Sequence, residues 1–342
     1  MIFEQVRSGG CLSYVVGCED TRAGFVVDPA LDHLDHYLAL ATERGLRLHY
    51  VFETHTHADH FSAARELAQR IRGKLVMNER SAAPHVDLRL GDGETVLVGK
   101  LRVRALSTPG HTDDSMCLVI GDRVLTGDTL LIGGTGRTDL PTGDPAALHA
   151  SLFDKLLALP GETRVFPAHD YKGRSSTTIA AELATNPRLQ RRARADFVAL
   201  MQSLDLAMPD HLTEALRTNR TGAKSVTQLI GEAAREIAFL SMDEVRRRLG
   251  TDLVLLDVRE RADYDAGHLP GARHLPRGQL ELRVDKELPD PTARILVYCQ
   301  VGRISTLATA TLRSMGYLRA VALDGGFAAW RDAGYPVEPT AP

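Results

Sequence analysis

The chain has 342 residues, a length at which a single hydrophobic core usually divides, so two domains are expected. Hydrophobic residues make up 44% and charged residues 25% of the sequence, as in an ordinary globular protein. The formal net charge is -3, and Lys and Arg are scattered without forming a basic stripe. This composition argues against nucleic-acid binding and favours small-molecule substrates.

The N-terminal stretch MIFEQVRSGGCLSYVVG alternates like a strand, with neither the basic segment and apolar core of a signal peptide nor a transit pattern. The apolar runs are too short to span a bilayer. We therefore expect a cytoplasmic location and no membrane partner. The cysteines lie far apart in the sequence and are predicted to be reduced thiols, of which all but the last simply pack: Cys11, Cys18, Cys117 and Cys299.

Residues 12 to about 170 alternate short apolar runs with helical stretches and tight turns, which predicts a mixed α/β region. Residues 31–45 and 61–73 carry apolar side chains at three- and four-residue spacing and end at glycine, as helices do. The dipeptides Asp92-Gly93 and Gly121-Asp122 are typical of hairpin turns.

Further along the chain, residues 186–204 and 225–250 have the pattern of helices, and the polar stretch RTNRTGAKS (217–225) separates them. Strands are then predicted at 253–258, 294–299 and 320–325, with a helix at 304–315. Strands that alternate with helices suggest a parallel sheet. The predicted organisation is a first domain over residues 1–220, a linker at 221–235 and a second domain at 236–342.

Histidines are concentrated in one short stretch. THTHADH (54–60) holds three histidines and an aspartate directly after the apolar run Tyr50 to Phe52. TPGH (108–111), TGD (126–128) and PAHD (167–170) each follow another strand-like run. If these strands belong to neighbouring sheets, their ends can converge at one edge. The side chains brought together would be His55, His57, Asp59, His60, His111, Asp128 and His169.

A metal site accounts for this set economically, because imidazole suits zinc, iron and other first-row ions and a carboxylate can bridge two ions. One such histidine alone would more often be a partly buried side chain than a ligand. Four motifs, each at the end of a predicted strand, favour the metal site.

THTHADH, TPGHT, TGDTLL and PAHDY, in this order, resemble the metallo-β-lactamase fold over about residues 1 to 220. The resemblance implies an αββα sandwich, and two branches compete. Glyoxalase II enzymes use all seven side chains for a binuclear site and hydrolyse a glutathione thioester. Persulfide dioxygenases hold one Fe(II) with two histidines and one aspartate, and oxidise glutathione persulfide with O2.

The stretch GGTGRTDLPTGD (133–144) and the segment 167–189 resemble the dioxygenase branch, since glyoxalase II enzymes carry a lysine and an aromatic hydroxyl where this chain has Arg137 and Asp139. The resemblance then implies one Fe(II) per chain, bound by His55, His111 and Asp128. Four further side chains would surround these ligands without binding the iron: His57, Asp59, His60 and His169.

Two histidines and one carboxylate leave three positions on Fe(II), so a persulfide sulfur and O2 can bind side by side. The products would be sulfite and glutathione. Arg137 and Tyr171 match positions that contact glutathione in glyoxalase-like relatives, and arginine can hold a carboxylate with two hydrogen bonds. The alternative is that Arg137 only fixes its loop through Asp139.

Residues 253–271, 298–306 and 323–337 resemble a single rhodanese domain, over roughly 235 to 342. Cys299 ends a strand and faces a helix N-terminus, where a thiolate is favoured, so it is the predicted nucleophile. Asp257 and Arg259 are interpreted as scaffold below the loop. The loop that would cradle an anion contains Gln300, Val301, Gly302, Arg303, Ile304 and Ser305.

A phosphatase would carry arginine at the sixth position after the cysteine, where this chain has Ser305, so the cysteine is expected to transfer sulfur. It would take the outer sulfur of thiosulfate or a persulfide and pass it to glutathione.

The two halves resemble a fusion of a persulfide dioxygenase and a rhodanese. The partners implied are glutathione persulfide, glutathione, O2, and thiosulfate or sulfite, and assembly into a homo-oligomer stays open. One alternative is a binuclear zinc hydrolase of glutathione thioesters. In the other, the C-terminal domain binds sulfur or a partner without turnover.

Overall fold

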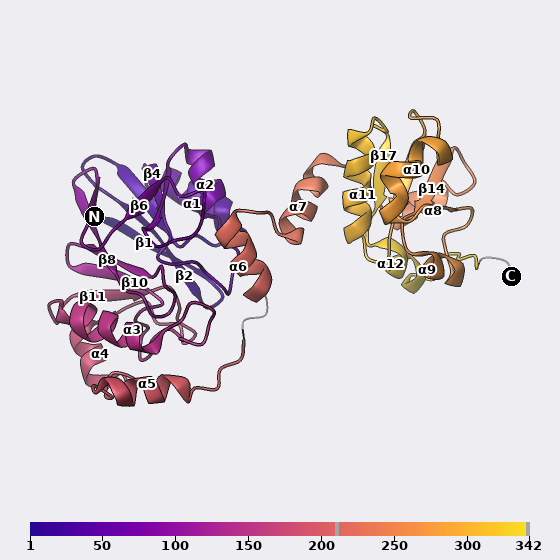
Figure 1. Ribbon diagram of the computed structural model, residues 1–342. Coiled ribbons are helices and arrows are strands. Elements are labelled where there is room, and N and C mark those ends of the chain that lie inside the picture. The colour runs from indigo at the N-terminus through magenta and orange to yellow at the C-terminus, as the bar shows by residue number, and fades with distance from the viewer. Residues whose placement is uncertain (209–211, 340–342) are drawn as a thin grey trace. The chain divides into compact units, whose positions relative to one another are not determined.

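The computed structural model describes residues 1–208 and 212–339. The chain forms two compact units, Met1–Ala223 and Lys224–Pro342 (Figure 1). The predicted linker at 221–235 spans this division, and most of it forms helix α7 (Val226–Glu236), which packs on a helix of the second unit.

The first unit contains two six-stranded sheets, with the orders β1-β2-β3-β4-β5-β6 and β12-β11-β10-β9-β8-β7. The strands of the first sheet are β1 (Ile2–Ser8), β2 (Cys11–Gly17), β3 (Ala23–Val27), β4 (Arg47–Phe52), β5 (Lys74–Asn78) and β6 (Leu88–Leu90). Those of the second are β7 (Thr95–Val98), β8 (Leu101–Ser107), β9 (Met116–Ile120), β10 (Arg123–Gly127), β11 (Arg164–Pro167) and β12 (Thr177–Thr178).

Helices cover the outer faces of both sheets (Figure 1). On the first sheet lie α1 (Leu34–Glu43), which follows a 3-10 turn at Leu31–His33, and α2 (Ala64–Ile71). On the second lie α3 (Pro145–Ala150), α4 (Ile179–Thr185) and α5 (Arg194–Gln202), with a π-helical turn at Ser151–Lys155 and a 3-10 turn at Leu156–Ala158. Helix α6 (Leu212–Thr221) ends the unit.

The main core lies between the two sheets, where alternate side chains of each strand point inward. Phe25 and Phe52 of the first sheet are fully buried with Val103 and Leu118 of the second. Two outer cores lie between the sheets and their helices. The predicted αββα sandwich is therefore confirmed.

The second unit contains one sheet with the order β13-β17-β16-β14-β15, and every pairing in it is parallel. Its strands are β13 (Phe239–Leu240), β14 (Leu253–Asp257), β15 (Arg273–His274), β16 (Arg294–Tyr298) and β17 (Ala320–Leu323). Its helices are α7, α8 (Met242–Arg247), α9 (Arg261–Ala266), α10 (Leu280–Glu287), α11 (Arg303–Ser314) and α12 (Gly326–Asp332), with a 3-10 turn at Arg277–Gln279.

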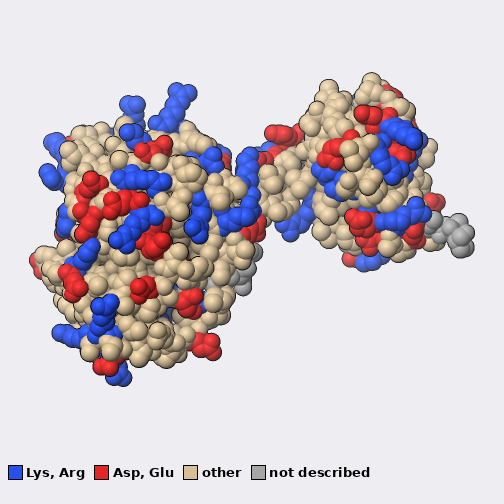
Figure 2. Space-filling view, in the orientation of Figure 1, with Lys and Arg blue, Asp and Glu red and all other residues tan. Residues whose placement is uncertain are grey.

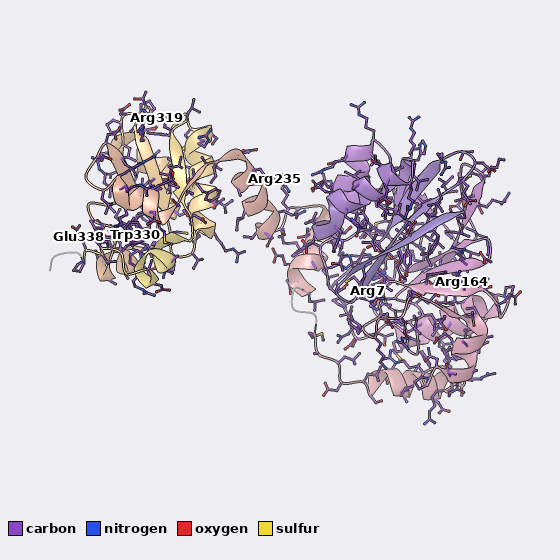
Figure 3. The ribbon with its side chains drawn as sticks, turned by 180° about the vertical axis from the view of Figure 1, so that it is seen from behind. Arg7, Arg164, Arg235, Arg319, Trp330 and Glu338 are labelled. Carbon is purple, nitrogen blue, oxygen red and sulfur yellow. The ribbon has the colours of Figure 1, made fainter. Side chains whose placement is uncertain are left out.

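Clusters of apolar side chains cover both faces of this sheet, which explains why β16 is continuously apolar in sequence. Trp330 of α12 is fully buried on one face (Figure 3), and its indole N–H donates to the Pro336 carbonyl at 2.9 Å. The prediction of a smaller α/β domain with a parallel sheet is confirmed.

Four local predictions were wrong. Asp92-Gly93 joins β6 of one sheet to β7 of the other and forms no hairpin, whereas Gly121-Asp122 does connect the antiparallel pair β9 and β10. Residues 225–250 form α7, a short strand and α8, because Ser241 caps a new helix with Glu244. The helix expected from residue 186 begins only at Arg194.

Residues 217–221 of the polar stretch belong to α6, although they were expected to separate two helices. No helix in the described part of the chain is both long and apolar enough to cross a membrane. On the face drawn in Figure 2, positive and negative side chains are interspersed.

The single tryptophan, Trp330, lies in the second unit, so its fluorescence follows the unfolding of that unit alone. Leu296→Ala, in the second unit, removes a fully buried side chain from the Trp330 cluster and should lower the free energy of unfolding of that unit by about 2–5 kcal/mol. Tryptophan fluorescence during urea unfolding measures this loss. Leu118→Ala, in the core of the first unit, is the matched control. An equal shift of the tryptophan transition in both variants would contradict the division into two units.

Candidate metal centre

The four sequence motifs lie directly after strands β4, β8, β10 and β11. All seven predicted side chains meet there, linked by contacts between neighbours. The ring centres of His55 and His57 lie 4.1 Å apart, and the ring centres of His57 and His60 lie 4.3 Å apart. His169 bonds both Asp59 and Asp128 at 2.7 Å. Within this assembly the potential metal ligands form three groups.

The first group is His55, His111 and Asp128, whose ligand atoms lie within 4.8 Å of one another. Hydrogen bonds at Nδ1 orient both rings. His111 Nδ1 lies 2.8 Å from the carbonyl oxygen of Arg137, so it carries the proton. His55 Nδ1 lies 3.0 Å from Thr54 Oγ1, whose own proton goes to Asp28. In both rings Nδ1 is therefore the hydrogen-bonded nitrogen, and Nε2 is the nitrogen that faces the group.

The first group fits a divalent iron ion. His55 Nε2 is buried and has no hydrogen-bond partner among the described residues. Burial and the neighbouring His57 lower the pKa of His55 well below its ordinary value, so the ring is neutral. His111 Nε2 lies 3.6 Å from Asp128 Oδ2. Two imidazoles and one carboxylate are the donors found in non-haem Fe(II) oxygenases.

The second group is Asp28, Glu53 and His57, all buried. His57 Nε2 lies 3.2 Å from Asp28 Oδ1 and 3.5 Å from Glu53 Oε2. Burial raises the pKa of Glu53 to about 7. Neither carboxylate was predicted from the sequence to belong to the site. The signal was that Asp28 directly follows β3 and Glu53 directly follows β4, at the same strand ends as the motifs.

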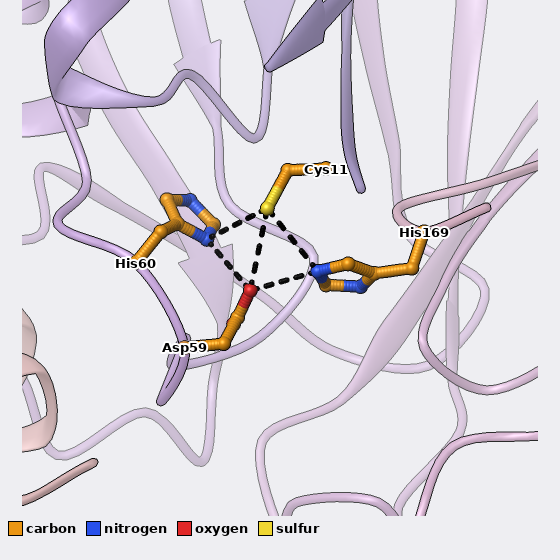
Figure 4. A group of neighbouring side chains, drawn as sticks. All are labelled: Cys11, Asp59, His60 and His169. Atoms are coloured by element: carbon orange, nitrogen blue, oxygen red, sulfur yellow. Dashed lines mark hydrogen bonds and ion pairs between the residues drawn. The ribbon is translucent and has the colours of Figure 1, made fainter. Parts of the chain in front are cut away.

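The third group is Cys11, Asp59, His60 and His169, drawn in Figure 4. Cys11 Sγ lies 3.4 Å from Asp59 Oδ2 and 3.3 Å from His169 Nε2. The sequence analysis expected this thiol only to pack. Its position depends on β2 meeting the segment after β11, where Cys11 and His169 form an isolated β-bridge.

The charges of the third group stabilise one another. Burial opposes the ionisation of Asp59, but hydrogen bonds from His169 and His60 hold the pKa of Asp59 well below its ordinary value. Burial likewise opposes a charged His60, yet Asp59 and Cys11 raise the pKa of His60 to about 10. The group therefore contains cationic imidazoles facing a carboxylate when no metal is bound.

A side chain of helix α6 forms hydrogen bonds with the segment between β4 and α2, which contains the motif THTHADH and is called the histidine loop below. Asn219 donates from Nδ2 to the carbonyl oxygens of His57 and His60, both at 2.9 Å. Its Oδ1 accepts from the Ser62 backbone at 3.0 Å. One amide side chain thus holds three points of the loop, and it lies more than 150 residues away along the chain.

A cavity of about 650 Å³ lies beside the first and third groups. Its floor includes Cys11, Asp59, His111, Asp128 and His169. Its wall includes the polar side chains Arg137, Asp170, Tyr171, Lys172, Arg174 and Arg188. Both the first and the third groups therefore face the same space.

Arg137 and Tyr171 both line this cavity. The guanidinium of Arg137 donates two hydrogen bonds of 2.6 Å to Asp139 and one of 2.7 Å to the Ala207 carbonyl oxygen. Tyr171 is 80% exposed, and its ring stacks on His169 at 6.0 Å. Gly10 leaves the space for it, since a Cβ there would lie 2.2 Å from the tyrosine ring.

In the second unit, Cys299 follows β16 and precedes α11. Its Sγ accepts a hydrogen bond of 3.2 Å from the Ser305 backbone N–H, in the first turn of that helix. Gly302 takes a left-handed conformation with φ of 85°, which lets the loop turn tightly into α11. The loop therefore directs a helix N-terminus at the sulfur.

A buried ion pair supports this loop, as the sequence analysis expected. Arg259 contacts Asp257 at 2.6 Å and lies 3.9 Å from the centre of the Phe327 ring. It also donates to the Gln300 side chain at 3.3 Å. The remaining loop side chains Val301, Arg303 and Ile304 are exposed around the cysteine.

Comparison with known proteins matches residues 6–169 to the metallo-beta-lactamase superfamily and residues 241–333 to the rhodanese-like domain. The human mitochondrial persulfide dioxygenase ETHE1 is 34% identical over 218 residues, which are 63% of this chain and 85% of that protein. The chain belongs to the persulfide dioxygenase family.

Solved structures agree with this family. The crystal structure of ETHE1 from Myxococcus xanthus matches this chain with a TM-score of 0.64 at 40% identity. The match covers 66% of this chain and the whole of the ETHE1 chain. A metallo-beta-lactamase from Staphylococcus aureus covers 95% of this chain and 98% of that one, with a TM-score of 0.61; at 22% identity it shows the fold alone. The present chain therefore carries a rhodanese-like domain after its metallo-beta-lactamase domain.

The three hydrogen bonds between Asn219 of α6 and the histidine loop should affect how tightly the protein retains a metal ion. Asn219→Ala removes all three side-chain hydrogen bonds to the histidine loop, and we expect affinity for a divalent metal to fall by about 10- to 100-fold. Equilibrium dialysis with metal analysis measures the change. Thr221→Ala, on the same helix but bonded within it, is the matched control. Equal losses of metal affinity in both variants would indicate a general effect on the helix. They would contradict a specific role for the Asn219 side chain.

Proposed function

We propose that the first unit oxidises glutathione persulfide with O2 to sulfite and glutathione, using one Fe(II) held by His55, His111 and Asp128. The observation that carries the proposal is that the ligand atoms of His55, His111 and Asp128 lie within 4.8 Å of one another beside a cavity, with the Nε2 of His55 buried and unpartnered among the described residues. Bound there, Fe(II) would supply electrons to O2 and coordination positions for the persulfide sulfur and O2.

The surrounding residues would orient the ligands. His169 Nδ1 bonds Asp128 Oδ1 at 2.7 Å, which fixes the carboxylate and leaves Oδ2 toward His111. Asp28 acts through Thr54, since that hydroxyl sets the tautomer of His55. In this proposal His57, Asp59, His60 and His169 do not bind the iron.

Glutathione persulfide would occupy the cavity, whose volume is in the usual range for a small-molecule site. Tyr171 stands at the rim and Arg137 in the wall, so we propose both as contacts of the tripeptide. The bonds from Arg137 to Asp139 and Ala207 hold its guanidinium in one orientation. Binding would then require little reordering of that side chain.

For the second unit we propose sulfur transfer by Cys299. Its thiolate would attack the outer sulfur of thiosulfate, the S–S bond would break, and sulfite would leave with the electron pair. A glutathione thiolate would then take the outer sulfur from the cysteine persulfide and release the Cys299 thiolate. The reaction runs in either direction, so the unit can supply glutathione persulfide or convert product sulfite to thiosulfate.

A hydrolase of glutathione thioesters with two zinc ions is the second candidate. The proximity of Asp59, His60 and His169 favours it, because their ligand atoms lie within 4.8 Å of one another beside the first group. The two candidates differ in metal, co-substrate and product.

O2 consumption separates them. Protein loaded with Fe(II) should consume O2 and release sulfite when glutathione persulfide is added, and His111→Ala should reduce both rates to background because a predicted iron ligand is lost. An oxygen electrode and sulfite assay measure this. His36→Ala, at an exposed position on α1, should keep the full rate. Iron-loaded protein without O2 uptake, combined with thioester hydrolysis by zinc-loaded protein, would favour the hydrolase.

Cys299→Ser tests the second unit. We expect thiosulfate-to-glutathione sulfur transfer to fall to background, since serine cannot carry the sulfur, while O2 uptake with added glutathione persulfide stays unchanged. Sulfite release from thiosulfate measures the transfer. If the variant transferred sulfur at the original rate, Cys299 would not be the nucleophile, and a binding module without turnover would become the better interpretation.

A further inference from the structure

We propose that Arg188 binds a carboxylate of the thiol substrate in the cavity beside the metal centre. This deepens the proposed function of the first unit, on which it rests, because it assigns one anionic end of glutathione persulfide to one guanidinium. Arg188 lies shortly after α4, lines the cavity and is partly buried. It was not predicted from the sequence to belong to the site.

Three arginine side chains line the cavity, and two of them are already paired with a carboxylate of the protein. The Nε and Nη2 atoms of Arg137 each donate to Asp139 at 2.6 Å. The same two atoms of Arg174 donate to Oδ1 of Asp170 at 2.9 and 2.7 Å. These atoms form the edge with which a guanidinium holds a carboxylate through two hydrogen bonds. In both side chains that edge is therefore occupied.

Arg188 differs from the other two because the same edge of its guanidinium is open. Its Nη1 donates to the carbonyl oxygen of Thr135 at 2.6 Å and to the hydroxyl of that residue at 3.0 Å. Among the residues that the structure describes, Nε and Nη2 have no hydrogen-bond partner and the guanidinium has no carboxylate partner. Two parallel donors of Arg188 are thus available to a ligand in the cavity.

The charge of Arg188 is not compensated within the described part of the chain. Burial lowers the pKa of Arg188, whereas the hydrogen bonds to Asp139 raise the pKa of Arg137. A guanidinium stays protonated at physiological pH, so a partly buried one without an anion has lost hydration without gaining an ion pair. A carboxylate supplied by a ligand would restore this balance.

A buried network fixes the position of Arg188 before any ligand binds. Its backbone N–H donates to Oδ1 of Asn186 at 3.0 Å. The buried Asn186 donates from Nδ2 to Glu182 at 2.7 Å and to the Gly134 carbonyl oxygen at 2.9 Å. Glu182, also buried, accepts from the Gly133 backbone N–H at 2.9 Å. The network joins the end of α4 to the loop that contains both glycines, so binding would require little reordering.

The loop that holds Arg188 also packs against the metal centre. Thr135 accepts the bonds from Arg188, and the next residue, Gly136, is so close to His111 that a Cβ there would lie 2.9 Å from the imidazole ring. Both His111 and Arg188 line the cavity. Glutathione persulfide carries carboxylates on its glycine and γ-glutamyl residues, away from its sulfur. The fork of Arg188 suits such a group better than the single, exposed ammonium of Lys172, which also lines the cavity.

Binding of glutathione to iron-loaded, full-length protein without oxygen tests the inference by isothermal titration calorimetry, and needs no turnover. Arg188→Gln, which can still donate to the Thr135 carbonyl oxygen, should weaken binding by about 10- to 100-fold, because a charged double hydrogen bond is lost. Lys172→Ala, the matched control, removes an exposed cation from the same cavity and should change the affinity by less than about 3-fold.

Two analogues of glutathione separate a carboxylate contact from a general effect on the loop. One has its glycine carboxylate converted to an amide, and the other lacks the α-carboxylate of the γ-glutamyl residue. One of the two should bind the unaltered protein about 10- to 100-fold more weakly than glutathione does. Arg188→Gln should bind that analogue and glutathione equally, which also identifies the carboxylate concerned.

The inference fails if Arg188→Gln binds glutathione as tightly as the unaltered protein, or if Lys172→Ala weakens binding equally. It also fails if the unaltered protein does not prefer glutathione to either analogue, or if Arg188→Gln loses affinity for all three ligands by the same factor. Arg188→Lys, which keeps the charge, should recover part of the affinity, and circular dichroism excludes loss of fold.

O2 uptake with glutathione persulfide is measured separately on the same protein. A protein without O2 uptake that still shows the carboxylate preference dependent on Arg188 would contradict the dioxygenase proposal and support this inference. Uptake at the full rate in Arg188→Gln, with unchanged affinity for glutathione, would contradict this inference and leave the dioxygenase proposal intact.

Discussion

The carboxylate of Asp28 is the constraint on which the metal centre depends. One oxygen accepts from the Thr54 backbone at 2.7 Å and lies 3.2 Å from His57, and the other accepts from the Thr54 hydroxyl at 2.8 Å. Through that hydroxyl it determines which nitrogen of His55 is free. A single buried acid thus fixes the start of the histidine loop and the tautomer of its first ligand. It holds this position because β3 and β4 are parallel neighbours, which brings their ends to the same edge.

The motifs could be predicted from the sequence because each is local. A polar run directly after an apolar strand marks the edge of a sheet, and β4, β8, β10 and β11 all end in this way. The contributions of Cys11 and Asn219 could not be predicted. Cys11 enters through the bridge to His169, and Asn219 through α6, so both contacts join segments more than 150 residues apart. No pattern within a short window of sequence encodes such pairings.

The same distinction explains the local errors in the fold. Asp92-Gly93 has the composition of a hairpin turn, but turn residues specify a change of direction and not the sheet that the next strand joins. Cys299 was predictable because strand, loop and helix follow one another directly. The packing of Gly326 against the loop could not be predicted. This contact is close, since a Cβ at Gly326 would lie 2.7 Å from the Cys299 carbonyl oxygen. That contact comes from α12, after another strand and turn.

The two groups of donors are joined at Asp128, and this has a physical consequence for both. One oxygen of Asp128 faces His111 in the first group, and the other bonds His169 in the third. When His169 is cationic, it withdraws charge from the carboxylate and would weaken Asp128 as a ligand of an ion in the first group. The protonation state of His169 therefore couples the third group to the first without any movement of the backbone.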